Sequence, residues 1–216
     1  MFVGHYGVGF AAKAVKKTIP LWQLFIAVQL VDIAWATLVL FGVEKFRIVP
    51  GITAASPLDL YYIPYTHSLL AVVIWSLAAM VIYRFAVKRS TWLVAGVIAV
   101  TVLSHWLLDL LVHRPDLPLY DNHMKVGLGL WNYPVLSFAL EALCLFGGMF
   151  FYYRATQPVG GRGRYAMIVF GLVMLGVQST ALFSPPPPSA NAVAVMALVS
   201  YFLFAAVVYW LEKKRA

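Results

Sequence analysis

The stretch 92-WLVAGVIAVTVLSHWLLDLLV-112 decides the fold, because it is strongly apolar, has no Lys or Arg and contains a single acidic residue, Asp109. An apolar run of about 20 residues is long enough to cross the hydrocarbon core of a bilayer as a helix. A helix is required there because each backbone N–H and C=O group must find its partner within the segment. The range 92–112 is therefore predicted to span a membrane.

Similar runs lie on both sides of this stretch, separated by segments that hold most of the Pro, Lys and Arg. Together they predict six transmembrane helices, at about 21–41, 66–85, 92–112, 133–153, 165–183 and 192–211. The protein is 62% hydrophobic and only 11% charged, with a mean hydropathy of +0.84. This leaves too little polar surface to cover a water-soluble globule. We therefore expect an all-α membrane protein that forms a single domain over residues 1–216.

The segment 1–17 precedes the first span and is predicted to be a re-entrant or amphipathic helix. Its apolar part is too short to cross a bilayer, and Gly4, Gly7 and Gly9 allow a neighbouring helix to approach closely. A short helix can enter the membrane from one side when protein covers its far end. The sequence thus predicts a helical hairpin formed by residues 1–17 and the first span.

Basic residues are distributed unequally between alternate loops. One set of loops holds Lys13, Lys16, Lys17, Arg84, Lys88, Arg89, Arg154, Arg162, Arg164, Lys213, Lys214 and Arg215, and the other holds Lys45, Arg47, Arg114 and Lys125. Because basic loops stay in the cytoplasm, both termini are predicted to be cytoplasmic. This asymmetry and contact with anionic lipid explain the net charge of +8, so no nucleic-acid partner is expected. The single cysteine, Cys144, excludes an intrachain disulfide and a CxxC metal site.

Ionisable side chains within apolar spans are costly and indicate functional sites by default. His105, Asp109 and His113 are spaced four residues apart, so they form one stripe along a helix. In the predicted hairpin, His5 and Asp32 are equally distant from the turn and lie level with each other. The alternative interpretation of the stripe is a hydrogen-bonded network between packed helices; its cost within the membrane and its convergence with His67 favour a functional site.

His67 and Glu141 lie at a similar depth, roughly 20 to 25 Å along their helices from the basic loops. Imidazole and carboxylate groups that share a depth predict a metal site with nitrogen and oxygen ligands, suited to Zn, Mn or Fe. Such an ion activates water and polarises phosphoryl or carbonyl oxygen, so hydrolysis is the expected chemistry. Alternatively, His67 simply follows the N-cap of a span, and Glu141 is a neutral group hydrogen-bonded to another helix.

At these residues the chain resembles the YdjM-type inner-membrane proteins, described as metal-dependent hydrolases and related to zinc-dependent phospholipases C and single-strand nucleases. The matching pieces are His5 with its glycines, Val31-Asp32-Ile33, Thr66-His67-Ser68-Leu69-Leu70 and Ser104-His105 through Asp109, which cover about the first half of the chain. The resemblance implies a bacterial cytoplasmic membrane protein that binds a divalent metal, most simply Zn. The metal ligands that it implies are His5, Asp32, His67, His105 and Asp109.

The chain departs from this family at two places. The family often has His-Arg-Gly ahead of Thr-His-Ser, whereas this chain has Tyr62, Ile63 and Pro64, so an Arg contact to phosphate is missing there. A Thr usually found three residues after the family's Asp is here Val112, and His113 follows at once as a further candidate ligand. The substrate class is therefore not fixed by the resemblance.

The first functional hypothesis is a membrane-embedded metal-dependent hydrolase acting on a lipid-borne ester or phosphoester. Its candidate catalytic residues are Asp109, His113 and Glu141, and the cations that can attract a phosphate at its mouth are Arg114, Lys125 and Arg47. The alternatives are a transporter or channel that uses the cluster as a proton or metal-ion relay, and a subunit of a membrane complex. A relay needs access from both faces, and the inner halves of the spans have almost no polar residues.

Overall fold

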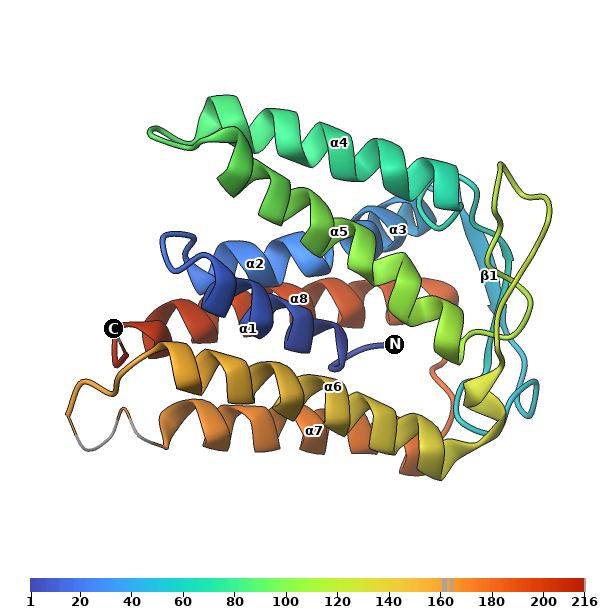
Figure 1. The fold of residues 1–216 in the computed structure, drawn as a ribbon. Helices are drawn as coiled ribbons and strands as arrows, with labels where there is room; N and C mark the ends of the chain where they lie inside the picture. The colour runs from blue at the N-terminus through green and yellow to red at the C-terminus, as the bar shows by residue number, and fades with distance from the viewer. Residues whose placement is uncertain (161–162, 164, 216) are drawn as a thin grey trace.

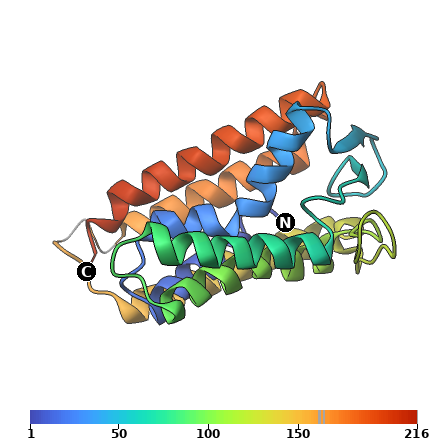
Figure 2. The ribbon, with the colours of Figure 1, turned by 90° about the horizontal axis from the view of Figure 1, so that it is seen from above.

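A computed structural model describes residues 1–160, 163 and 165–215, with main chain only at 181 and 182. The described chain is mostly helical and forms a bundle with a small β-hairpin at one end (Figures 1 and 2). The helices are α1 (His5–Val15), α2 (Leu21–Val28), α3 (Leu30–Leu40), α4 (Leu69–Ala86), α5 (Trp92–Val112), α6 (Pro134–Ala155), α7 (Ala166–Phe183) and α8 (Ala190–Glu212). The strands are β1 (Lys45–Ile48) and β2 (Leu58–Tyr62), and a single 3-10 turn, Leu130–Asn132, precedes α6.

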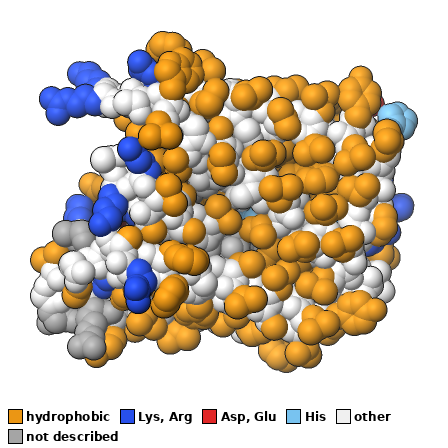
Figure 3. All heavy atoms as spheres, in the orientation of Figure 1, with side chains coloured by type: hydrophobic (Ala, Val, Ile, Leu, Met, Phe, Trp, Pro, Cys, Tyr) orange, Lys and Arg blue, Asp and Glu red, His pale blue; other side chains and the backbone are white. Residues whose placement is uncertain are grey.

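The sequence predicted apolar helices long enough to cross a membrane, and the described residues form four or five of them. Among the described residues, α4, α5, α6 and α8 are each long and apolar enough to cross a membrane, and α2 with α3 makes a fifth candidate if the bent pair is one span. The apolar part of α7, Ala166–Thr180, is shorter. Many apolar side chains on the outside of the bundle are exposed, as the hydrophobic surface in Figure 3 shows. The chain is therefore built as a membrane protein.

The first predicted span, 21–41, is wrong as a single helix. The helix is interrupted at Gln29, and α2 and α3 meet at an angle of 53°. The side-chain amide of Gln29 donates to the main-chain oxygen of Phe2 over 3.2 Å, which ties the break to the start of the chain. The last carbonyls of a helix have no partner within it, so the end of α2 leaves main-chain oxygens free for other donors.

The β-hairpin corrects the prediction of an all-α fold. Strands β1 and β2 pair antiparallel within the segment between α3 and α4, which the sequence indicated only as an outward loop. Figure 1 places this hairpin and the α5–α6 loop at one end of the bundle, and the C-terminus with the α4–α5 and α6–α7 connections at the other. Lys and Arg side chains gather at the C-terminal end on the face shown in Figure 3. We call the end with the β-hairpin the capped end, and the end with the C-terminus the basic end.

Helix α1 packs against α6 and α2 (Figure 1). Its contact with α6 is a direct approach of two backbones, because a Cβ atom added to Gly7 would overlap the main-chain oxygen of Cys144. A Cβ added to Gly148 would likewise overlap the main-chain oxygen of Gly7. Small residues permit such crossings between membrane helices. The approach places His5, the first residue of α1, in the interior of the bundle.

Candidate metal site

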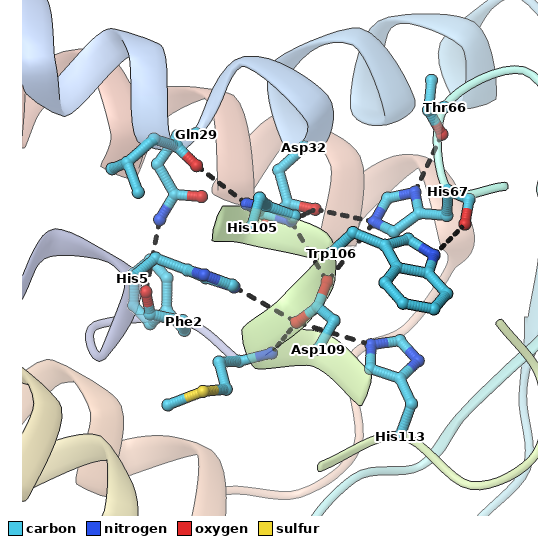
Figure 4. Close-up of polar contacts among 12 residues, drawn as sticks. Phe2, His5, Gln29, Asp32, Thr66, His67, His105, Trp106, Asp109 and His113 are labelled. Carbon is cyan, nitrogen blue, oxygen red and sulfur yellow. Dashed lines mark hydrogen bonds and ion pairs between the residues drawn. The ribbon is translucent and has the colours of Figure 1, made fainter. Parts of the chain in front are cut away.

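Buried histidines and aspartates from α1, α3, α5 and the segment before α4 converge inside the bundle (Figure 4). His5 begins α1, Asp32 lies in the first turn of α3, and His67 precedes Ser68, the N-cap of α4. His105 and Asp109 lie one turn apart on α5, and His113 is the C-cap of that helix. All six side chains are at most 12% exposed, so the bundle shields the cluster from its surroundings.

One half of the cluster centres on Asp32. Its Oδ1 lies 3.3 Å from Nε2 of His67 and 3.4 Å from Nε2 of His105. One ligand atom from each of these three residues lies within 4.8 Å of the other two, which suits three ligands of one ion. His5, His105 and Asp109 form a second such group, so the two groups share His105.

Asp109 faces the two halves of the cluster with different oxygens. Its Oδ2 lies 3.1 Å from Nε2 of His105 and 3.8 Å from Nε2 of His67. Its Oδ1 lies 3.1 Å from Nε2 of His5 and 3.8 Å from Nε2 of His113, and it also pairs with the amino group of Met1. This carboxylate therefore contacts groups on both sides and lies at the centre of the cluster.

Three of the histidines direct Nε2 into the cluster while Nδ1 contacts a group outside it. Nδ1 of His105 lies 2.8 Å from the main-chain oxygen of Val28, at the break between α2 and α3. Nδ1 of His113 lies 2.9 Å from Oδ1 of Asp116, and Nδ1 of His67 lies 2.8 Å from the hydroxyl of Thr66. A carbonyl or carboxylate partner at Nδ1 leaves Nε2 unprotonated in the neutral ring, which is the usual arrangement of a metal-binding histidine.

The donor set fits a divalent cation. Among the described residues, the buried Nε2 of His105 has no hydrogen-bond partner of normal geometry, although it faces both Asp32 and Asp109. An unprotonated nitrogen and two carboxylates in a buried site repel one another unless a cation lies between them. Nitrogen and oxygen donors in this number are those of a Zn site, and of Mn or Fe sites.

Glu141, a predicted catalytic residue, contacts main chain and lies outside both three-residue groups. Its Oε1 accepts a hydrogen bond from the N–H of Phe2 over 2.9 Å, and its Oε2 accepts one from the N–H of Gly4 over 2.6 Å. Gly4 is the N-cap residue of α1 and Phe2 lies two residues before it, so this carboxylate binds the chain that leads into the helix. Glu141 thus holds the helix that carries His5.

Several residues around the cluster were missed by the sequence analysis, because each acts over a long sequence separation and lies in no motif. Tyr201 of α8 donates its hydroxyl to Oδ2 of Asp32 over 2.8 Å. Trp106 donates its indole N–H to the main-chain oxygen of His67 over 2.9 Å. Glu44 is buried and bonded to Thr66, and burial raises the pKa of its carboxyl above the ordinary value.

The cations expected at the mouth of the site are engaged with protein groups. Arg47 Nε lies 2.6 Å from Oδ2 of Asp59, and Arg114 pairs with the other oxygen of the same carboxylate. Lys125 donates to the main-chain oxygen of Tyr61 over 2.8 Å, and partial burial lowers its pKa. The capped end therefore holds an ion-pair network close to His113.

Fold and cluster together define a class: a polytopic helical membrane protein with a buried His/Asp cluster. No protein-family model matches the chain, and no curated protein or solved structure shows a significant match to it.

Proposed function

We propose that the protein is a membrane-embedded metal-dependent hydrolase. The observation that carries this proposal is the convergence of Asp32, His67, His105 and Asp109 with ring nitrogens free for a cation. Intramembrane ionisable groups are costly, and a cluster of them is maintained for a function. The resemblance of the same residues to the YdjM-type family supports the same chemistry.

Two positions for a metal ion follow from the two oxygens of Asp109. Asp32, His67 and His105 with Oδ2 of Asp109 supply four donors for the first position. The group His5, His105 and Asp109 supplies donors for the second, where Oδ1 of Asp109 lies 3.1 Å from Nε2 of His5 and also pairs with the amino group of Met1. Zn is the proposed ion because four nitrogen and oxygen donors suit its tetrahedral preference, with Mn and Fe as alternatives.

A bound ion of this kind supplies Lewis-acid activation of water and of an ester or phosphoester group. The protein's own contribution is to position the ligands and to move a proton. His113 is suited to that second role, because Asp116 fixes its Nδ1 and leaves Nε2 directed at the cluster. Asp116 is positioned to stabilise the imidazolium that forms when His113 takes a proton from water.

The proposed substrate is a lipid-borne ester or phosphoester. A site buried within apolar helices is reached most directly from the bilayer, where lipids supply such groups. The engagement of Arg47 and Arg114 with Asp59 means that these cations attract a phosphate only as members of an ion-pair network. A neutral ester is therefore as suitable as a phosphoester.

The proposed topology has six spans with α1 as a re-entrant helix. It counts α2 with α3 as one broken span and α7 as the fifth, and it places α1 between α2 and α6 without crossing the bilayer. Apolar helices of the required length support four or five of these spans. The gathering of Lys and Arg at the basic end supports a cytoplasmic location for that end, in a bacterial cytoplasmic membrane.

The test is the metal content of protein purified in mild detergent, measured by elemental mass spectrometry. We expect stoichiometric Zn, Mn or Fe in the wild type, a loss in Asp32→Ala, and a larger loss in His105→Ala because both three-residue groups contain His105. His5→Ala is expected to lose only the second position. A wild type that binds none of these ions after reconstitution contradicts the proposal and favours a proton relay or a structural subunit.

A further inference from the structure

Glu44 is a buried carboxylate in the segment between α3 and β1. Its Oε1 accepts hydrogen bonds from the main-chain N–H groups of Tyr65 and Thr66, over 2.8 and 3.0 Å. Its Oε2 accepts the hydroxyl hydrogen of Thr66 over 2.6 Å. All three donors belong to the two residues immediately before His67, so Glu44 holds the chain at the point where a proposed ligand is attached.

The Thr66 hydroxyl has one hydrogen and two polar neighbours. One is Oε2 of Glu44. The other is Nδ1 of His67, which lies 2.8 Å away (Figure 4). The hydroxyl donates to Oε2 of Glu44, so its hydrogen points towards this carboxylate, which in its ionised form only accepts hydrogen bonds. The hydroxyl oxygen then accepts from His67, whose Nδ1 must carry the ring proton. A neutral imidazole protonated at Nδ1 has a free lone pair at Nε2.

We propose that Glu44 is a positioning residue that acts through Thr66 to keep Nε2 of His67 unprotonated and directed at Asp32. The proposal rests on the proposed metal-binding function and extends it to a residue that contacts no member of the cluster directly. The main chain of His67 is held separately, because Trp106 donates to its carbonyl oxygen over 2.9 Å. Glu44 therefore fixes the main chain before His67 and, through the Thr66 hydroxyl, the orientation of the ring, whereas Trp106 holds only the main chain.

The comparison with the other two histidines explains why His67 needs this additional group. Nδ1 of His105 faces a main-chain carbonyl, and Nδ1 of His113 faces the Asp116 carboxylate. Both partners are acceptors only, so each fixes the ring proton by itself. A hydroxyl both donates and accepts, so Thr66 alone leaves the tautomer of His67 undetermined. A second acceptor beyond the hydroxyl removes the ambiguity, and Glu44 occupies that position.

Glu44→Gln tests the inference with an isosteric change. The amide oxygen can keep the two main-chain N–H groups, while the amide N–H₂ group donates to the Thr66 hydroxyl. The hydroxyl hydrogen then turns to Nδ1 of His67, and the ring proton moves to Nε2. We expect nitrogen NMR of the metal-free, ¹⁵N-histidine-labelled protein to show this change of tautomer at His67. The Zn²⁺ affinity, measured by chelator competition, is expected to fall about 10- to 100-fold.

Thr66 and Ser68 provide the matched variants. Thr66→Val removes the hydroxyl and is expected to lower the Zn²⁺ affinity as Glu44→Gln does, whereas Thr66→Ser restores the wild-type value. Ser68→Ala is the control, because this buried hydroxyl donates to the main-chain oxygen of Pro64 and caps α4 without touching the His67 ring. We expect wild-type Zn²⁺ affinity in Ser68→Ala.

Two results overturn the inference: an Nε2-protonated His67 in the metal-free wild type, or an unchanged tautomer and affinity in folded Glu44→Gln. If Glu44→Gln does not fold, the inference is tested by comparing Thr66→Val with Thr66→Ser. Equal Zn²⁺ affinities in these two variants contradict the hydrogen-bond relay from Glu44 through Thr66 to His67. Because the tautomer is measured without metal, the inference about Glu44 can fail or hold independently of the proposed metal-dependent function. A wild type with the expected tautomer that binds no Zn²⁺ contradicts the hydrolase and leaves the hydrogen-bond relay in place.

Discussion

Tyr201 of α8 donates its hydroxyl hydrogen to Oδ2 of Asp32 over 2.8 Å, so the last helix holds a carboxylate of α3 in place. The other oxygen of Asp32 is left to face His67 and His105. Both Tyr201 and Asp32 are buried, so water does not replace this hydrogen bond when it is lost. The orientation of a proposed ligand thus depends on a residue 169 positions away in the sequence.

Replacing Tyr201 by Phe removes this hydrogen bond and keeps the ring. Because Asp32 is then free to rotate, we expect the Zn²⁺ affinity to fall by about tenfold or more. Chelator competition with the purified protein measures the change. Tyr209→Phe, on an exposed part of the same helix, is the control and is expected to bind as the wild type does. Equal affinities in the two variants would show that Tyr201 does not position Asp32.

The main expected effect of replacing Glu141 is a lower free energy of unfolding. Glu141→Leu leaves the buried N–H group of Gly4 and the partly buried N–H group of Phe2 without an acceptor, at a cost of about 1–3 kcal/mol for the buried group. Glu141→Gln keeps one acceptor oxygen and is expected to be less destabilised. The free energy of unfolding in detergent, together with metal content, gives the comparison. A Glu141→Gln variant with wild-type stability and metal content but no hydrolysis would instead support the catalytic role predicted from the sequence.

The contact between α1 and α6 predicts opposite effects at two adjacent glycines. Gly148→Ala places a methyl group against the main chain of Gly7, so we expect a destabilisation of about 1–3 kcal/mol and loss of the metal that His5 helps to bind. Gly147→Ala, where a Cβ meets no atom within 4 Å, is expected to be neutral or stabilising, because Ala favours helix more than Gly does. Thermal unfolding and metal analysis test both variants. Equal stability of the two would contradict the close approach.

The orientation of the bundle is testable with single cysteines in a Cys144→Ala background. Lys88 lies in the α4–α5 connection at the basic end, and Leu128 lies in the α5–α6 loop at the capped end; both are exposed. We expect a membrane-impermeant maleimide to label Leu128→Cys in intact cells and Lys88→Cys only after lysis. The reverse pattern would invert the proposed topology, and labelling of both in intact cells would contradict a spanning arrangement of α5.

The sequence predicted both ends of α5 correctly, because the features that define this helix lie within it or next to it. The range 92–112 agrees with Trp92–Val112, which begins after a hydroxyl cap from Thr91 and ends where His113 takes an extended conformation. The apolar run and its capping residue are both local features, so the sequence alone displays them. The stripe of His105 and Asp109 follows from the same helix.

The break at Gln29 and the role of Glu44 were not predictable in this way. Neither Gly nor Pro marks the break, and its partners are Phe2, at the start of the chain, and His105, in the third predicted span. Glu44 reaches Thr66, the residue before His67, only because the β-hairpin folds its segment back against the start of α4. Both features depend on contacts between distant segments, which hydrophobic periodicity does not encode.

The position of α1 has a consequence for biogenesis. His5 is synthesised well before α6, yet its helix packs on α6. Asp32, His67, His105 and Asp109 can therefore meet in a nascent chain while His5 still lacks its place, because Gly148 and Glu141 have yet to emerge. We therefore expect His5 to take its place in the cluster only after the fourth long apolar segment has been synthesised.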